Sequence, residues 1–229
     1  MTSVLMVMTS HEELGDTGQT TGWYLSEAAH PWKVFTEAGF DLLFTSPSGG
    51  RPAMDGADDD DEITAEFLDT FGPDGPDTVT PDTIDASQFD VVFFVGGHGA
   101  MWDLPGDERL AGIAADVFDA GGVVSAVCHG PAGLVDVVLG DGTHLVAGRD
   151  VAAFTNSEEK ASDTFEVVPF LIEDRLRERG ATHHPAPDFE EKVVTDGRLV
   201  TGQNPASATG VAEAVVAVVG ETSGDTSDG

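Results

Sequence analysis

The sequence is poor in cysteine and in basic residues, and it has no long uninterrupted hydrophobic run. One cysteine among 229 residues excludes an internal disulfide and fits a reducing compartment. No apolar segment is long enough to cross a bilayer, and the strand-like residues 4–8 lack the basic stretch and cleavage site of a secretion signal. We therefore expect a soluble, cytoplasmic protein.

Positive charge is scarce because 10 lysine and arginine residues stand against 42 aspartate and glutamate residues, a formal net charge of −32. Such a chain repels nucleic-acid phosphates and anionic membranes, so we expect neither as a partner. The acidity is spread along the chain while apolar segments remain intact, which favours a folded protein with a carboxylate-covered surface. A halophilic cytoplasm is the simplest explanation, and it predicts that folding needs molar salt to screen self-repulsion.

Short β-branched runs alternate with amphipathic segments, a pattern typical of an α/β fold with a mostly parallel sheet and helices on both faces. The length favours one domain, at residues 1–220, with an acidic surface excursion at about 50–85 and a disordered acidic tail at 221–229. We expect strands at 4–8, 40–45, 89–95, 123–127, 144–146, 151–154, 192–194 and 199–200. We expect helices at 31–39, 65–68, 107–120, 131–139, 169–180 and 206–219.

The only cysteine stands where a strand is expected to turn into a helix. Val123–Val127 is a short β-branched run, and Cys128 and His129 follow it before a Gly-Pro break. Enzymes of the α/β class present a nucleophile on such a sharp turn, so Cys128 is the candidate nucleophile. The helix N–H groups beyond it would lower the pKa of the thiol and could hold an oxyanion. The alternative is a buried, chemically inert cysteine.

A second apolar strand, 91–95, opens into the glycine turn Gly96-Gly97-His98-Gly99. The carboxyl ends of parallel strands share one edge of a sheet, so this turn should lie beside Cys128 and supply a second oxyanion donor. From this turn His98 could contact substrate. We expect no metal and no cofactor, because the other histidines lack ligand spacing: His11, His30, His144, His183 and His184.

Six segments in order resemble the ThiJ/PfpI superfamily, the cysteine branch of the class I glutamine-amidotransferase-like fold. They are Thr21–Pro31, Ser46–Gly50, Gly96–Gly99, Ala126–Pro131, Phe154–Glu159 and Asp196–Ser207. Within the superfamily they resemble the heat-shock chaperone branch also described as glutathione-independent glyoxalase, or glyoxalase III. The resemblance implies a three-layer, flavodoxin-like sandwich with a mostly parallel central sheet.

The resemblance also implies roles for particular residues. Cys128 corresponds to the nucleophile, His129 to its partner and Glu27 to the glutamate that approaches the thiol. The acid that completes a Cys-His-Glu triad comes from Glu158-Glu159, where position favours Glu159 without separating the two neighbours. Composition alone would instead make Glu27 one more surface carboxylate, and Glu158-Glu159 solvated charge at a helix start.

By the same resemblance, Gly97 and His129 match the positions whose backbone N–H groups form the oxyanion hole. His98 and Gly130 are grouped with them as oxyanion or substrate-binding residues. The alternative for His129 is that it caps or packs, because neighbouring residues on a regular helix do not face each other. The elbow must therefore turn His129 toward Glu159 if a triad is to form.

The implied activity is the conversion of a 2-oxoaldehyde such as methylglyoxal into a 2-hydroxy acid such as lactate. A thiolate adds to the aldehyde as a hemithioacetal, His129 or Glu27 moves a proton through an enediol, and a thioester is hydrolysed. Glu27 beside a thiolate in a dry pocket should have a raised pKa and donate its proton. The enzyme would be a cofactor-independent lyase of the glyoxalase III or D-lactate dehydratase type.

Other functions remain open from the sequence. One is a stress-responsive holdase chaperone that binds unfolded proteins, with Cys128 as an oxidation sensor, and another is a deglycase that acts on glycated proteins. Another is a cysteine peptidase or amidohydrolase that uses the same elbow. The acidic partner of Cys128-His129 favours chemistry, because a holdase needs no triad. A homodimer is suggested only by the resemblance.

Overall fold

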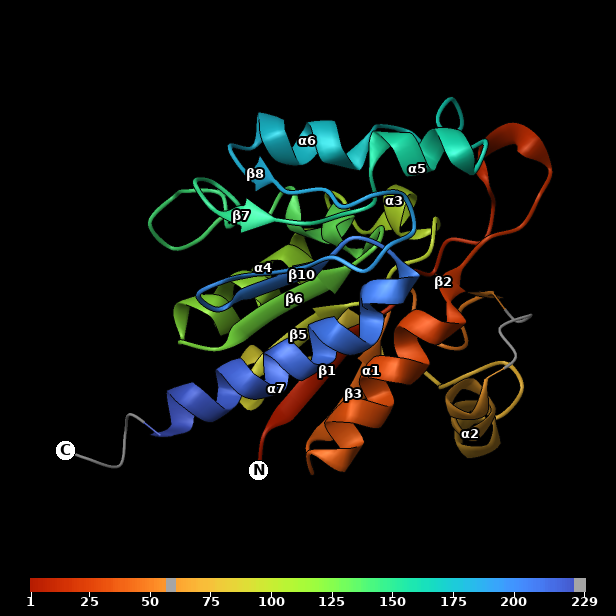
Figure 1. Cartoon of the computed structure of the whole chain (residues 1–229). Helices are drawn as coiled ribbons and strands as arrows, with labels where there is room; N and C mark the ends of the chain where they lie inside the picture. The colour runs from red at the N-terminus through yellow and green to blue at the C-terminus, as the bar shows by residue number, and fades with distance from the viewer. Residues whose placement is uncertain (57–60, 225–229) are drawn as a thin grey trace.

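The computed structural model describes residues 1–56 and 61–224, and it is built on a six-stranded sheet with the strand order β3-β1-β5-β6-β10-β9 (Figure 1). The strands are β1 (Ser3–Val7), β3 (Asp41–Thr45), β5 (Val91–Phe94), β6 (Val123–Val127), β9 (Val193–Asp196) and β10 (Leu199–Gly202). All neighbours pair in parallel except β9, which forms an antiparallel hairpin with β10. The predicted α/β class is confirmed.

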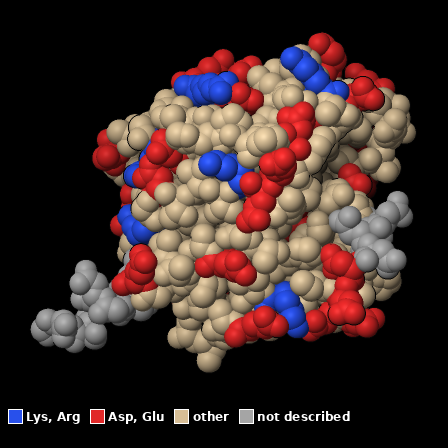
Figure 2. Space-filling model, viewed as in Figure 1, with Lys and Arg blue, Asp and Glu red and all other residues tan. Residues whose placement is uncertain are grey.

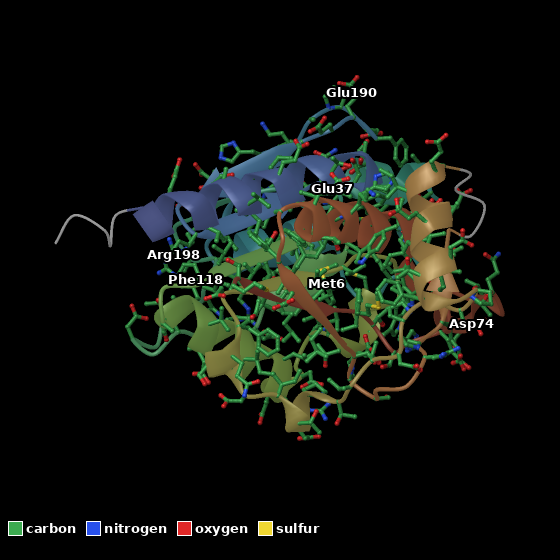
Figure 3. All side chains as sticks on the ribbon, turned by 90° about the horizontal axis from the view of Figure 1, so that it is seen from below. Met6, Glu37, Asp74, Phe118, Glu190 and Arg198 are labelled. Carbon is green, nitrogen blue, oxygen red and sulfur yellow. The ribbon has the colours of Figure 1, made fainter. Side chains whose placement is uncertain are left out.

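Helices cover both faces of this sheet. One face carries α1 (Leu25–Glu37) and α7 (Ala208–Gly224), which pack against each other, and the opposite face carries α4 (Glu108–Asp119) (Figure 3). All residues of β5 and β6 are buried, as expected for parallel strands covered on both sides. Figure 3 also shows Met6 of β1 in the interior, whereas the exposed Asp74 lies near the periphery. The structure therefore has the expected three layers.

Smaller elements complete the chain. The short strands pair as β2 (Trp23–Tyr24) with β4 (Met54–Asp55) and β7 (Asp150–Val151) with β8 (Thr182–His183). The remaining α-helices are α2 (Glu62–Phe71), α3 (Ala100–Asp103), α5 (Asn156–Ala161) and α6 (Ile172–Glu178). The 3-10 helices are η1 (Gly15–Thr17), η2 (Pro81–Thr83), η3 (Ala86–Gln88), η4 (Gly130–Leu134) and η5 (Pro205–Ser207).

Helix α1 begins at Leu25, so the expected start at Pro31 is wrong. Pro31 lies inside the helix, where its missing N–H and its ring cost about 3 kcal/mol. A buried stripe at helical spacing includes Leu25, Trp32 and Phe35, and burying one large apolar side chain stabilises by about 1.5–3 kcal/mol. Packing against the sheet thus outweighs the local preference of proline, and the extra turns place Glu27 in the first turn of the helix.

The helix expected at 131–139 is also wrong, because η4 ends at Leu134. Cβ atoms at Gly130 and Gly133 would overlap Phe94, so these glycines allow close packing on β5 but favour helix poorly. The chain then folds back, with Leu145 N–H donating to Val137 O at 2.9 Å. The strand expected at 144–146 is accordingly reduced to one bridge between Val138 and His144.

The expected excursion and tail are only partly as predicted. Residues 50–85 contain β4, α2 and η2, and Val79 pairs with Thr45 at the edge of the sheet. The helix α7 extends to Gly224, so residues 221–224 are helical rather than disordered, while 57–60 and 225–229 lie outside the described residues. The buried apolar side chains form one connected core. The assignment of residues 1–220 to a single domain stays a prediction.

Acidic groups outnumber basic groups on the visible surface (Figure 2). Figure 2 shows acidic side chains scattered over the visible face, with few basic groups among them. Within the described ranges, no helix is both long enough and apolar enough to cross a membrane.

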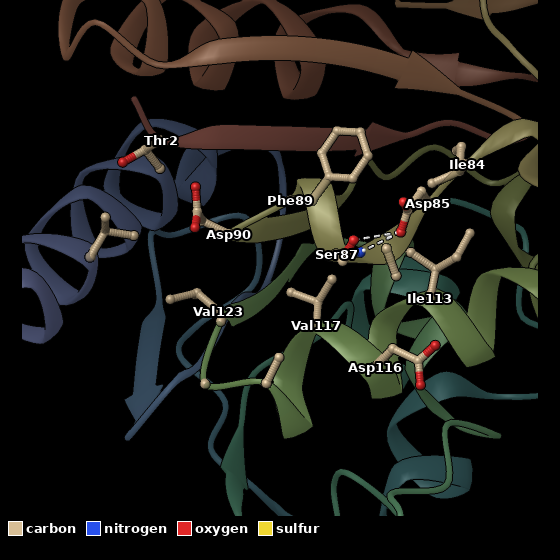
Figure 4. Close-up of a pocket in the computed structure, with 15 residues that line it drawn as sticks. Thr2, Ile84, Asp85, Ser87, Phe89, Asp90, Ile113, Asp116, Val117 and Val123 are labelled. Carbon is tan, nitrogen blue, oxygen red and sulfur yellow. Dashed lines mark hydrogen bonds between the residues drawn. The ribbon is translucent and has the colours of Figure 1, made fainter.

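The strand order reverses direction between β1 and β5, because β1 leads to β3 on one side and β5 leads to β6 on the other. In open α/β sheets, ligands bind at the carboxyl ends of the strands beside such a switch point. Cys128 follows β6 and the glycine turn follows β5, so both lie at this edge. A cavity of about 810 Å³ lies at the opposite end of the strands, near their first residues. Thr2, Asp90 and Val123 are among the residues that line it (Figure 4).

Candidate active site

Cys128 adopts a strained backbone conformation at the end of β6. Its φ is +60°, in the left-handed region that residues other than glycine rarely adopt. Two backbone hydrogen bonds hold it there: the Cys128 N–H donates to Gly202 O, and the Phe154 N–H donates to Cys128 O, both at 3.0 Å. The predicted sharp turn after β6 is therefore present.

The turn brings His129 between the thiol and a glutamate. Cys128 Sγ lies 3.3 Å from His129 Nδ1, and His129 Nε2 lies 2.6 Å from Glu159 Oε1. His129 and Glu159 are fully buried, and Cys128 is 4% exposed. The alternatives of a capping histidine and a solvated Glu159 do not fit this geometry. The residues form a continuous Cys-His-Glu series.

The structure separates the two neighbouring glutamates. Thr155 is the N-cap of α5, its hydroxyl accepts from the Glu158 N–H, and the Glu158 carboxylate accepts from the Thr155 N–H, which makes a capping box. Glu158 is thereby turned away from His129, while Glu159 faces it. The preference for Glu159 as the partner of His129 agrees with this geometry.

The electrostatics of the pair favour one tautomer of His129. Burial raises the pKa of Glu159, but the neighbouring His129 and the hydrogen bonds from His129, His98 and Thr164 outweigh burial and bring the net pKa well below its ordinary value. Burial and the neighbouring His98 lower the pKa of His129. A neutral ring that donates from Nε2 to the ionised Glu159 keeps an unprotonated Nδ1 toward the thiol.

The pKa of the Cys128 thiol is raised, so the expected lowering is wrong. Burial is the largest cause, and the Glu27 carboxyl group beside the thiol is the second; a hydrogen bond from the His129 backbone N–H opposes them. The expected helix dipole is weak because η4 is a short 3-10 helix. This environment disfavours the thiolate, so attack by the sulfur needs a base to take its proton.

Glu27 reaches the thiol because the turn after β5 has no side chain in the way. Glu27 is fully buried, which excludes the surface-carboxylate interpretation. A Cβ at Gly96 would overlap Glu27 Oε2 and lie 2.8 Å from the Cβ of Cys128. Gly97 has a φ of +106°, and a Cβ there would overlap the Gly22 carbonyl. Both glycines thus permit close backbone approach at the site.

Gly130 also permits a close approach, because a Cβ there would overlap the Phe94 carbonyl. The oxyanion or substrate-binding roles of Gly97, His98, His129 and Gly130 stay predictions.

Thr164 is a site residue that the sequence did not suggest. Its hydroxyl donates a short hydrogen bond to Glu159 Oε2 and lies 3.3 Å from His98 Nε2. The His98 and His129 rings are 4.1 Å apart, and the side chain of His98 is 21% exposed. Thr164 therefore fixes the second oxygen of Glu159, and His98 is the member of the site that solvent reaches.

Three of these residues could form a metal site. Within the described part of the chain, ligand atoms of His98, His129 and Glu159 lie within 4.8 Å of one another. Both nitrogens of His129 already face Cys128 and Glu159, so a metal would have to displace one of these partners. The expectation of no metal stays a prediction.

Comparisons with known proteins find chains that are similar over most of their length. The chain is 32% identical over 225 residues to the glutathione-independent glyoxalase HSP31 of Saccharomyces cerevisiae, covering 90% of this chain and 92% of that protein. The crystal structure of glyoxalase III from Candida albicans is 32% identical, with a TM-score of 0.84 and coverage of 95% and 97%. The Rapid Encystment Protein of Francisella tularensis is 33% identical, with a TM-score of 0.91 and coverage of 95% and 99%.

The family comparison covers nearly the whole fold. The DJ-1/PfpI family model matches residues 20–218, which span all of the site residues described above. The match includes the strand ends that carry Cys128 and the glycine turn, as well as the helices that carry Glu27 and Glu159. On this match and on the relatives, the chain belongs to the DJ-1/PfpI family.

Proposed function

We propose that this protein is a glutathione-independent glyoxalase that converts 2-oxoaldehydes such as methylglyoxal into 2-hydroxy acids such as lactate. The carrying observation is the Cys128–His129–Glu159 series, with Glu27 beside the thiol, in a chain whose relatives bear that activity in their names. The reaction adds water to the substrate and consumes no redox equivalent. We place it in the cytoplasm, where the lone thiol would stay reduced.

In the first step, Cys128 is the nucleophile and His129 is the base. As Cys128 Sγ attacks the aldehyde carbon, its proton passes to His129 Nδ1 and the carbonyl electrons move to oxygen; His129 then gives the proton to this oxygen, which completes the hemithioacetal. Because the thiol pKa is raised, the proton leaves during the attack rather than before it. The ionised Glu159 stabilises the imidazolium that forms.

Glu27 moves the proton between the two reacting carbons of the substrate. Its carboxyl group is buried beside the thiol and is held by the first turn of α1. It removes the hydrogen on the former aldehyde carbon as a proton and returns it to the neighbouring carbon, while the hydroxyl proton passes from the first oxygen to the second, so that the intermediate is an enediol. The product is a 2-hydroxyacyl thioester on Cys128. Water then cleaves the thioester, which releases the acid and restores the thiol.

Backbone N–H groups of His129 and Gly97 would stabilise the oxyanion in each addition step. The His129 N–H already favours negative charge on the sulfur of Cys128, which supports its place as a donor. One well-placed donor of this kind stabilises a transition state by about 3 kcal/mol. His98, on the solvent side of the site, would contact the substrate.

Lactate formation from methylglyoxal without glutathione tests the proposal. The parent protein should form lactate from methylglyoxal. The control variant His184→Gln should do the same, because His184 is a half-exposed histidine outside the site. Cys128→Ser and His129→Gln should lose at least about 10²-fold in kcat while remaining folded. A Cys128→Ser protein with the parent rate would reject the nucleophile. A folded parent protein without turnover would reject the substrate class and favour the chaperone or amidohydrolase hypotheses.

A further inference from the structure

A second buried carboxylate, Glu158, is not used by the proposed reaction. It is fully buried, and its oxygens are surrounded by donors from distant parts of the chain. Oε2 accepts from the Thr155 N–H and Oγ1, both at 2.9 Å; Oε1 accepts from the Phe189 N–H at 2.8 Å, Gln203 Nε2 at 3.1 Å and Asn204 Nδ2 at 2.9 Å. An ionised carboxylate suits this environment because it only accepts hydrogen bonds.

These donors join three segments around the site. Thr155 begins α5, which carries Glu159; Gln203 and Asn204 directly follow β10; and Phe189 lies in the connection between β8 and β9. Glu158 therefore ties the first turn of α5 to two other segments by side-chain contacts. A displacement of this turn would move Glu159 relative to His129.

Two tilted aromatic rings lie between the residue bonded to this carboxylate and the imidazole. The Phe189 ring lies 6.3 Å from the Phe154 ring, which lies 4.4 Å from the His129 ring. Phe189 has a φ of +61° and is 50% exposed, so burial alone does not explain its strained backbone. The hydrogen bond from its N–H to Glu158 supplies a restraint.

We propose that Glu158 is a positioning residue for the His129–Glu159 pair: it fixes the turn that carries Glu159 and the Phe154–Phe189 ring pair that lies against His129. The turnover part of this proposal rests on the proposed glyoxalase function. The predicted effect of Glu158 on the pKa of the Cys128 thiol does not rest on that function.

The charge of Glu158 gives a second, independent readout. It raises the pKa of the Cys128 thiol and that of the His129 imidazole. The other charged or titratable groups that act on these two are Glu27, Glu159 and His98. A neutral residue at position 158 should therefore let the thiol ionise at lower pH, although turnover falls.

The experiment compares Glu158→Gln and Glu158→Asp with a matched control, Glu173→Gln. Glu173 is a mostly buried carboxylate that accepts the Asn156 N–H at 2.8 Å, at the start of the same helix, and is not among the groups that act on Cys128 or His129. The measurements are kcat and KM for methylglyoxal, the pH dependence of iodoacetamide alkylation of the only cysteine, and Tm.

Glu158→Gln should lower kcat about 10- to 100-fold with KM changed only a few-fold, and should shift the alkylation midpoint to lower pH. Glu158→Asp keeps the charge but has a shorter reach, so it should lose kcat and keep the parent midpoint. Glu173→Gln should keep both the parent kcat and the parent alkylation midpoint.

Parent values of kcat and midpoint in Glu158→Gln would overturn the proposal. An equal loss of kcat in Glu173→Gln at an equal loss of Tm would also overturn it, because helix stability alone would then be responsible. If Glu158→Gln does not fold, an unchanged kcat in Glu158→Asp overturns it. A parent protein without glyoxalase turnover refutes the proposed function, while the alkylation midpoints still test Glu158.

Discussion

At the scale of single residues, the sequence was most informative where one residue type is rare. The lone Cys128 after a β-branched run identified the elbow, but two neighbouring glutamates could not be separated by position alone. The sequence did contain a discriminating signal, because Thr155 and Glu158 have the spacing of a capping box, which leaves Glu159 for His129. Thr164 had no such signal, since its contact with Glu159 depends on the turn that follows α5.

The direction of the thiol pKa could not be predicted from the sequence, because burial and the approach of Glu27 are tertiary properties. A free cysteine titrates at about pH 8.5. We predict that the alkylation of Cys128 by iodoacetamide has its midpoint at a higher pH than that. Glu27→Gln removes a neighbouring carboxylate and should lower that midpoint. Glu37→Gln, at the exposed end of the same helix, is the control and should leave it unchanged. A midpoint unaffected by Glu27→Gln would contradict the placement of Glu27 beside the thiol.

Glu159→Gln tests whether the carboxylate holds the His129 tautomer. An amide can donate toward Nε2 and so favour the tautomer with its proton on Nδ1, which then cannot accept the thiol proton. We predict a fall in kcat of about 10²- to 10⁴-fold, by analogy with the loss of the acid in a Ser-His-Asp triad. The measurement is steady-state kinetics, with the exposed Glu166→Gln as a control. Loss of less than about threefold would contradict the assigned role.

At the scale of helices and strands, prediction succeeded where local and tertiary preferences agree. The valine-rich strand β6 was predicted with its observed bounds because every residue in it is apolar or small and lies in the buried middle of the sheet. The start of α1 was mispredicted because its apolar stripe packs on the sheet despite Pro31. The helix after Cys128 was mispredicted because close packing of Gly130 and Gly133 on Phe94 is invisible in a linear sequence.

The turn after β5 provides a test at this scale. In Gly96→Ala, the added methyl group would overlap the Glu27 carboxylate and press on Cys128, so we predict a lower Tm and loss of most turnover. The matched control is Gly112→Ala, because a Cβ at this exposed position in α4 meets no atom of the described structure within 4 Å. Alanine is the better helix former, so the control should gain up to about 1 kcal/mol of stability. Parent activity in Gly96→Ala would refute the close approach of Glu27.

At the scale of the whole molecule, alternating segments were sufficient to predict the layers, since each strand and helix must bury an apolar face. The composition also predicted the acidic surface that Figure 2 shows. The strand order was not available from segment order alone, because it depends on which strands pair across the sheet. It is this order that brings the ends of β5 and β6 to one edge.

The net charge of −32 predicts that stability depends on salt. We expect molar potassium chloride to increase the free energy of unfolding by at least about 2 kcal/mol, a rise in Tm of about 4–8 °C, because salt screens repulsion between carboxylates. Thermal unfolding in dilute buffer and in molar salt measures this. Chloride rather than sulfate is used because sulfate strengthens apolar burial in any protein. Full stability in dilute buffer would contradict the expected halophilic adaptation.

In the proposed reaction, the single thiol of Cys128 carries out the glutathione-independent conversion of methylglyoxal. Its most direct test is to alkylate the parent protein progressively with iodoacetamide and to measure, on the same samples, intact mass and lactate formation. Because Cys128 is the only cysteine, a mass increase of one thiol adduct reports its occupancy. We predict that turnover falls in proportion to the alkylated fraction and reaches zero when Cys128 is fully modified. Lactate formation that persists in a fully alkylated, folded protein would show that Cys128 is not the nucleophile.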